Sequence, residues 1–135
     1  MRLAFILLVA GVALLKAQDF SYRVREVVLD QRDPVPVNVS TKSTTTLQFP
    51  APIQSLEGDG FTTKPNDERG DFYISPGVNW VSLRSLQPAA VQNLGVIIDG
   101  RIYEVVIQTA IDNDYAVIFR WPHTVRHVWS PPLLK

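Results

Sequence analysis

Runs of β-branched and aromatic residues alternate with short polar stretches along most of the chain beyond its first 17 residues. Pro, Gly, Asp and Asn stand between the runs, a pattern typical of β-strands joined by turns. No segment after Ala17 keeps a 3.6-residue apolar period, so the pattern predicts no further helix. We predict strands at about Ser21–Leu29, Val35–Val39, Ser43–Phe49, Ile53–Glu57, Phe72–Ser75, Trp80–Ser85, Asn93–Ile98, Arg101–Thr109 and Tyr115–Trp121, with a weak tenth over Val125–Trp129.

The predicted connections are short, which decides the expected sheet type. Parallel neighbours joined directly need a crossover of a dozen or more residues, and few connections here are that long. We therefore expect an all-β fold, an antiparallel β-sandwich of about 8–10 short strands, over residues 18–122. The longest irregular piece is the polar stretch Gly58–Asp71, which we expect at the surface.

The stretch NLGVIIDGRIYEVVI, Asn93–Ile107, has the form of a β-hairpin with Asp99-Gly100 as a two-residue turn. Such a turn needs positive φ at both positions and fixes the strand register. One face of the hairpin is then nearly all apolar, so we expect it to pack on a second sheet. The predicted cross-strand pairs are Ile98 with Arg101, Val96 with Tyr103, and Leu94 with Val105.

The first 17 residues form a separate segment. Arg2 precedes Leu3–Leu15, which is apolar apart from Gly11, and small Ala17 follows. Thirteen helical residues reach only about 20 Å, short of a hydrocarbon core of about 30 Å. We therefore interpret residues 1–17 as a secretory signal helix cleaved after Ala17, the alternative being an uncleaved membrane anchor. The remaining chain is expected to contain no integral membrane span.

Composition narrows the function classes. Cysteine does not occur in the sequence, which excludes a disulfide framework and a thiol nucleophile. The chain has 13 basic and 13 acidic residues, and subtracting Arg2 and Lys16 leaves 11 basic against 13 acidic. Without a basic stripe to contact phosphates, direct nucleic-acid binding is not expected.

Two short patterns could suggest a metal. On a helix this spacing would point His123 and His127 at one metal, whereas in a strand the two would share a face but lie about 13 Å apart, too far for one ion. Asp112-Asn113-Asp114 resembles a fragment of a calcium loop but lacks the Gly and bidentate Glu that follow in a full EF-hand loop. We interpret the tripeptide as a turn between strands, because Asp and Asn bond their own backbone.

Other candidate motifs are weak. Arg69-Gly70-Asp71 is a tripeptide that adhesion proteins display, and Asn38-Val39-Ser40 is a glycosylation sequon. No nucleophile elbow surrounds a serine, and no glycine-rich phosphate loop is present in the sequence. We therefore expect no catalytic residue, no cofactor and no metal, and the protein is not expected to be an enzyme.

Four segments, taken in order, resemble the N-terminal domain of the CagX/TrbG family, the outer-membrane-core subunit of type IV secretion and conjugation machines. They are TTTLQFPAPIQSLEGD, DFYISP, QNLGVIIDGRIYEVVI and YAVIFRWP, which together span residues 44–122. The family's linker and second β-domain have no counterpart in the 13 residues after Pro122. The chain departs from the family pattern at Ser75, Phe61 and Trp121. Positions that fit it are Phe49, Ile53, Gly58, Asp59, Ile74, Pro76, Asn93, Leu94, Arg101, Tyr103, Phe119, Arg120 and Pro122.

The resemblance implies a structural or interaction subunit of an envelope complex, part of an oligomeric ring in the periplasm at the outer membrane. Its partners would be other envelope proteins of the secretion machine. The alternative is a free periplasmic or extracellular module for a small ligand or glycan, for which Trp80, Trp121 and Trp129 would supply aromatic faces.

Three regions are candidates for partner contacts. These are the edge PVPVNVS, Pro34–Ser40, the loop Gly58–Asp71, and the tail His123–Lys135. The tail carries Trp129, Leu133 and Leu134 beside paired prolines, and such an apolar segment is suited to docking on a neighbour. The alternative for the tail is folding back on its own domain.

Overall fold

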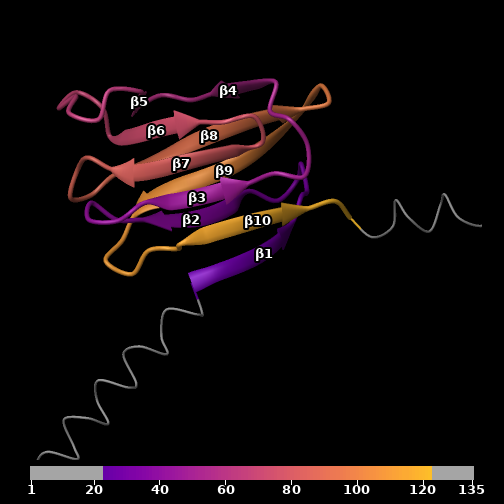
Figure 1. Cartoon of the computed structure of the whole chain (residues 1–135), viewed down its shortest axis with the longest axis horizontal. Coiled ribbons are helices and arrows are strands. Elements are labelled where there is room, and N and C mark those ends of the chain that lie inside the picture. Colours follow the sequence, from indigo (N-terminus) through magenta and orange to yellow (C-terminus); the bar gives the residue numbers. More distant parts are fainter. Residues whose placement is uncertain (1–22, 123–135) are drawn as a thin grey trace, which may run out of the picture.

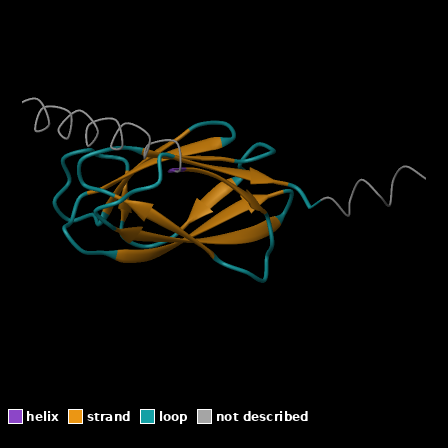
Figure 2. Cartoon of the chain, turned by 90° about the horizontal axis from the view of Figure 1, so that it is seen from below, coloured by secondary structure: helices purple, strands orange, loops and turns teal. Residues whose placement is uncertain are grey.

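The computed structural model describes residues 23–122, which form ten strands in two sheets packed face to face (Figures 1 and 2). The expected all-β sandwich is confirmed. The signal segment, the weak strand Val125–Trp129 and the tail residues Trp129, Leu133 and Leu134 lie outside the described residues. The strands are β1 (Val24–Val28), β2 (Val35–Val39), β3 (Thr45–Gln48), β4 (Ser55–Glu57), β5 (Phe61–Thr62), β6 (Phe72–Pro76), β7 (Trp80–Ser85), β8 (Val91–Ile98), β9 (Arg101–Thr109) and β10 (Ala116–Arg120).

Strand pairing is mixed, which corrects the expected antiparallel arrangement. One sheet has the order β1-β10-β3-β7-β6-β5 and the other β2-β9-β8-β4. Within residues 23–122, the pairs β1–β10, β10–β3, β2–β9 and β5–β6 are parallel, and the other four are antiparallel. The reason is that β1, β2 and β3 alternate between the sheets. Strand β1 pairs with β10, and β2 pairs with β9, so most of the domain lies between the two strands of each of these parallel pairs. That intervening chain supplies the long connection that a parallel pair requires.

Strand β5 was not predicted. It lies inside the stretch Gly58–Asp71, pairs with β6 for two residues, and is too short to produce a visible alternation. The nine predicted strands from Ser21 to Trp121 correspond to the other nine observed strands, with small differences at their ends.

The core lies between the inner faces of the two sheets. Alternate residues of β3, β7 and β10 from one sheet meet alternate residues of β8 and β9 from the other. The rings of Phe49 and Phe119 stack within this core, with 4.7 Å between ring centroids. The buried apolar residues are Leu29, Val37, Val39, Leu47, Phe49, Phe72, Ile74, Val81, Leu83, Leu94, Val96, Ile98, Tyr103, Val105, Ile107, Val117 and Phe119.

The β8–β9 hairpin has the predicted register, with Ile98 opposite Arg101. Asp99 and Gly100 have φ values of 51° and 73°, as a two-residue turn of the primed type requires. The Gly100 N–H also donates a hydrogen bond of 2.7 Å to Gln54 Oε1, which fixes the turn to the segment before β4.

Replacing Gly100 by valine is expected to lower the free energy of unfolding by about 1–3 kcal/mol, because a β-branched residue is strained at positive φ. A Cβ at this position would meet no atom within 4 Å, so crowding contributes nothing. Gly100→Asn is the matched control, since asparagine tolerates this backbone conformation. Urea denaturation of the three proteins measures the difference, and equal midpoints for the valine and asparagine variants would contradict the strain.

Candidate functional site

The edge strand β2, expected to be exposed, is closed by other parts of the chain. Its pairing with β9 includes the bond from Ala110 N–H to Val39 O, so Pro36 and Asn38 direct their backbone groups away from β9. Pro36 has no N–H, and its carbonyl oxygen accepts a 2.8 Å bond from Arg25 Nη2. Pro36 therefore contributes no outward backbone group to β2 that lacks a partner.

The outward backbone groups of Asn38, the second outward residue of β2, are also hydrogen-bonded. Its N–H donates to Asp114 Oδ2 at 3.0 Å, and its carbonyl oxygen accepts from Asp114 N–H at 2.9 Å. The Asn38 side chain accepts a 2.7 Å bond from Gln108 Nε2, so the sequon asparagine belongs to a strand rather than to an open loop. The expectation of a free edge at Pro34–Ser40 is therefore wrong, because Arg25 of β1 and Asp114 of the β9–β10 connection occupy it.

The tripeptide Asp112-Asn113-Asp114 lies in the connection between β9 and β10, where we expected a turn. Asp114 receives both Nε and Nη2 of Arg25 at 3.0 Å, while Asp112 contacts Arg23 at 3.3 Å. Asn113 is buried, and its Oδ1 accepts from the Ser43 hydroxyl. The side-chain oxygens of the tripeptide therefore bind different partners and do not converge on one point. Within residues 23–122, no cluster of three or more His, Asp or Glu side chains could hold a metal.

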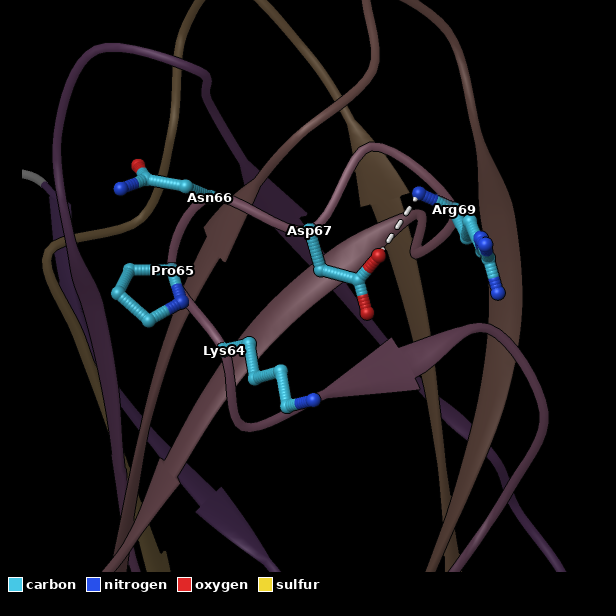
Figure 3. Close-up of a pocket in the computed structure, with 5 residues that line it drawn as sticks. All are labelled: Lys64, Pro65, Asn66, Asp67 and Arg69. Carbon is cyan, nitrogen blue, oxygen red and sulfur yellow. Dashed lines mark hydrogen bonds between the residues drawn. The ribbon is translucent and has the colours of Figure 1, made fainter.

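The loop Gly58–Asp71 encloses a shallow hollow of about 540 Å³ lined by Lys64, Pro65, Asn66, Asp67 and Arg69 (Figure 3). The backbone N–H of Arg69, at 3.1 Å, holds the pKa of Asp67 below its usual value, and the Thr62 hydroxyl acts in the same direction. The Asp67 carboxylate thus accepts hydrogen bonds from within the loop and stabilises the loop's conformation.

The Arg69-Gly70-Asp71 tripeptide is held against the domain. Asp71 Oδ2 accepts a 2.7 Å bond from Gln92 Nε2. Gly70 is buried so closely that a Cβ there would lie 2.5 Å from the Thr62 methyl group. This geometry does not present the tripeptide at a loop tip in the way an adhesion motif requires.

One end of the sandwich carries a groove that we call the C-terminal groove. Tyr103 of β9 and Trp121, which follows β10, meet edge to face with 6.5 Å between ring centroids. Within residues 23–122, the guanidinium groups of Arg32 and Arg101 have no hydrogen-bond or ion-pair partner. The groove has a volume of about 400 Å³ and is lined by Val28, Leu29, Asp30, Gln31, Arg32, Arg101, Tyr103, Trp121 and Pro122.

The two tryptophans of the described chain lie apart. Trp80 is opposite Gln48 on the outer face of the six-stranded sheet and packs against Gly77. Trp121 lies at the end of the sandwich against Tyr103. These side chains do not form one aromatic platform. Another hollow, of about 510 Å³, has no aromatic lining, and its residues are Ser40, Thr41, Lys42, Ser43, Leu86, Pro88, Thr109, Ala110, Ile111 and Asn113.

The chain matches no model of a known protein family, and no curated protein matches its sequence. In residues 23–122 there is no helix of sufficient length and apolar character to cross a membrane. With no matching family to indicate functional residues, the C-terminal groove is the candidate site that we infer from the structure.

Proposed function

We propose that the chain is a non-enzymatic structural or interaction subunit of a type IV secretion or conjugation envelope complex. It would act in the periplasm at the outer membrane as part of an oligomeric ring, with other envelope proteins of that complex as partners. The observation that supports this best is the meeting of two motif segments, since Tyr103 and Trp121 contact each other from opposite sheets.

These two segments are remote in sequence and both carry the CagX/TrbG resemblance. Arg101 and Tyr103 fit the family's Arg-x-Tyr strand, and Trp121 stands where its closing motif has tyrosine. A motif kept only for core packing would be buried throughout, but Trp121 is 37% exposed. Its neighbour Phe119 is 2% exposed, so the same motif contributes to the core and to the surface.

The chemistry of the C-terminal groove suits a protein partner. Trp, Tyr and Arg are enriched where proteins bind one another, because each combines a large apolar surface with polar groups. Arg32 and Arg101 offer planar donor sets that can bind carboxylates or backbone carbonyls of a neighbour. The groove is therefore the surface that we assign to assembly.

Replacing Trp121 by alanine is expected to weaken assembly. We expect the variant to lose most of its co-purification with the channel subunit and the secretion ATPase after cross-linking in the cell envelope. Burial of a tryptophan anchor at a protein interface contributes about 2 kcal/mol or more, so the loss should be on the order of thirtyfold. Quantitative mass spectrometry of the cross-linked complex is the measurement.

Trp80→Ala is the matched control, because Trp80 is 40% exposed but lies on the outer sheet face. It should retain the same partners as the unmodified protein. Equal recovery of these partners with both variants would contradict an assembly role for the groove. Neighbouring genes provide a second check: a genome lacking any secretion ATPase and channel subunit beside this gene would count against the proposed complex.

A further inference from the structure

The outer edges of the two sheets differ in how well they are protected. Strands β4 and β5 are edges of only three and two residues, and β2 is closed by Arg25 and Asp114. Strand β1 is the remaining edge of the described chain and is five residues long, Val24–Val28. Figure 1 shows it at the margin of the six-stranded sheet beside β10. Exposed edges of this length are templates for pairing with another chain.

The backbone groups of β1 can be assigned to the two sides of the strand. Leu29 N–H donates to Arg120 O, and Arg23 O accepts from Tyr115 N–H, both at 2.9 Å. The odd-numbered residues of β1 therefore bond to β10, since alternate residues of a strand point to opposite sides. The N–H and C=O groups of Val24, Glu26 and Val28 point outward, and they have no partner within residues 23–122.

The side chains along this edge have a distinct order. Val24 and Val28 are each 50% exposed, although valine is usually buried. Between them Glu26 accepts one bond, from Arg120 Nη2 to Oε1 at 2.9 Å. The second carboxylate oxygen of Glu26 accepts no hydrogen bond from the described residues. The outer face thus presents an apolar, an acidic and an apolar position in succession.

We propose that the free edge of β1 binds an extended segment of a different polypeptide, adding a seventh strand to this sheet. The incoming strand would place Lys or Arg opposite Glu26, with aliphatic or β-branched residues two positions away on both sides. Its main chain would bond to Val24, Glu26 and Val28, and the side-chain pattern would give specificity. Pairing at this edge does not depend on the secretion role, and Val28 is the one residue of the strand that also lines the C-terminal groove.

Charge argues against a second copy of this chain as the occupant. Two β1 strands paired antiparallel about their centres would place Glu26 directly opposite Glu26, and like charges at such positions are destabilising. A shift by two residues pairs Glu26 with valine but shortens the paired run of a five-residue strand. A basic segment from another protein avoids both costs.

The test uses the full-length protein and two fluorescent synthetic peptides, Thr-Val-Thr-Lys-Thr-Val-Thr and the same peptide with Glu in place of Lys. Fluorescence polarisation should show that the Lys peptide binds about three- to tenfold more tightly than the Glu peptide. The variant Glu26→Lys should reverse this preference. A reversal would support direct pairing at Glu26, because a non-specific apolar contact would not respond to charge in this way.

Val28→Pro tests the backbone bond. Proline removes an outward N–H that β10 does not use, and β2 already accommodates Pro36 at an outward position. Affinity for the Lys peptide should fall about tenfold, because the bond is lost and the ring obstructs the edge. Val28→Thr keeps the N–H and the branched shape, and should bind within about twofold of the unmodified protein.

Three results would overturn the proposal. They are equal affinity of Val28→Pro and Val28→Thr for the Lys peptide, an unchanged preference in Glu26→Lys, and a dimer of the unmodified protein that Val28→Pro abolishes. The last, measured by sedimentation velocity, would assign the edge to a second copy instead. Circular dichroism melts of every variant establish that a loss of binding does not come from unfolding.

Discussion

Replacing Phe119 by alanine is expected to lower the free energy of unfolding by about 3–5 kcal/mol, the range for removing a buried aromatic ring. Phe119 is 2% exposed and stacks on Phe49 with an interplanar angle of 4°. It belongs to β10, which lies between β1 and β3, so the cavity would open where distant parts of the chain join. Urea denaturation followed by tryptophan fluorescence measures the change.

Ile118→Ala is the control for Phe119→Ala. Ile118 is the neighbouring residue of β10, lies on the opposite face of the strand, and is only partly buried. We expect it to lower the free energy of unfolding by clearly less than Phe119→Ala, because it leaves no enclosed cavity. Similar losses for the two variants would mean that the inner face of β10 is not the face that packs between the sheets.

Replacing Asp114 by alanine is expected to lower the free energy of unfolding by about 2–3 kcal/mol. The change removes the acceptor of Arg25 Nε and of the Asn38 N–H, while Arg25 Nη2 keeps its bond to the Pro36 carbonyl oxygen. Removing one partner of a fully buried pair costs about 3–5 kcal/mol. We reduce this figure because the Arg25 side chain is 37% exposed and water screens the charge. Thermal and urea denaturation measure the loss.

The same loop supplies the control for Asp114. Asp112 forms an ion pair with Arg23, but its side chain is 89% exposed and the contact is 3.3 Å long. Asp112→Ala is therefore expected to change stability by less than about 1 kcal/mol, as for other surface ion pairs. If the two alanine variants were equally destabilised, the Arg25–Asp114 pair would not be what closes the β2 edge.

Local features of this fold could be predicted from the sequence. The register of β8 with β9 follows from Asp99-Gly100, since a two-residue turn and a period of two determine every cross-strand pair. The lateral order of the sheets could not be predicted in this way. The pairing of Val24 with Ala116 joins residues at opposite ends of the domain, and no local pattern in either strand identifies the other as its partner.

The candidate surfaces also depend on contacts between distant parts of the chain, which local sequence patterns do not reveal. Pro36 marks β2 as an edge strand, and β2 is indeed at the edge of its sheet. Whether an edge is open depends on what folds over it, here Arg25 and Asp114, which are 89 positions apart. Strand β1, VREVV, contains no proline of the kind that marks β2, so its exposed edge is visible only in the structure.

The parallel pairing of β1 with β10 determines how the domain would respond to mechanical force. The chain enters β1 at Val24 and leaves β10 at Arg120, at opposite ends of one ladder. A pull between these points draws the two strands past each other along their length, so the hydrogen bonds of the ladder carry the load together. In an antiparallel hairpin pulled at its open end, the bonds would break one after another. A domain connected in this way resists stretching along its terminal strands, a useful property for any component held under tension between two neighbours.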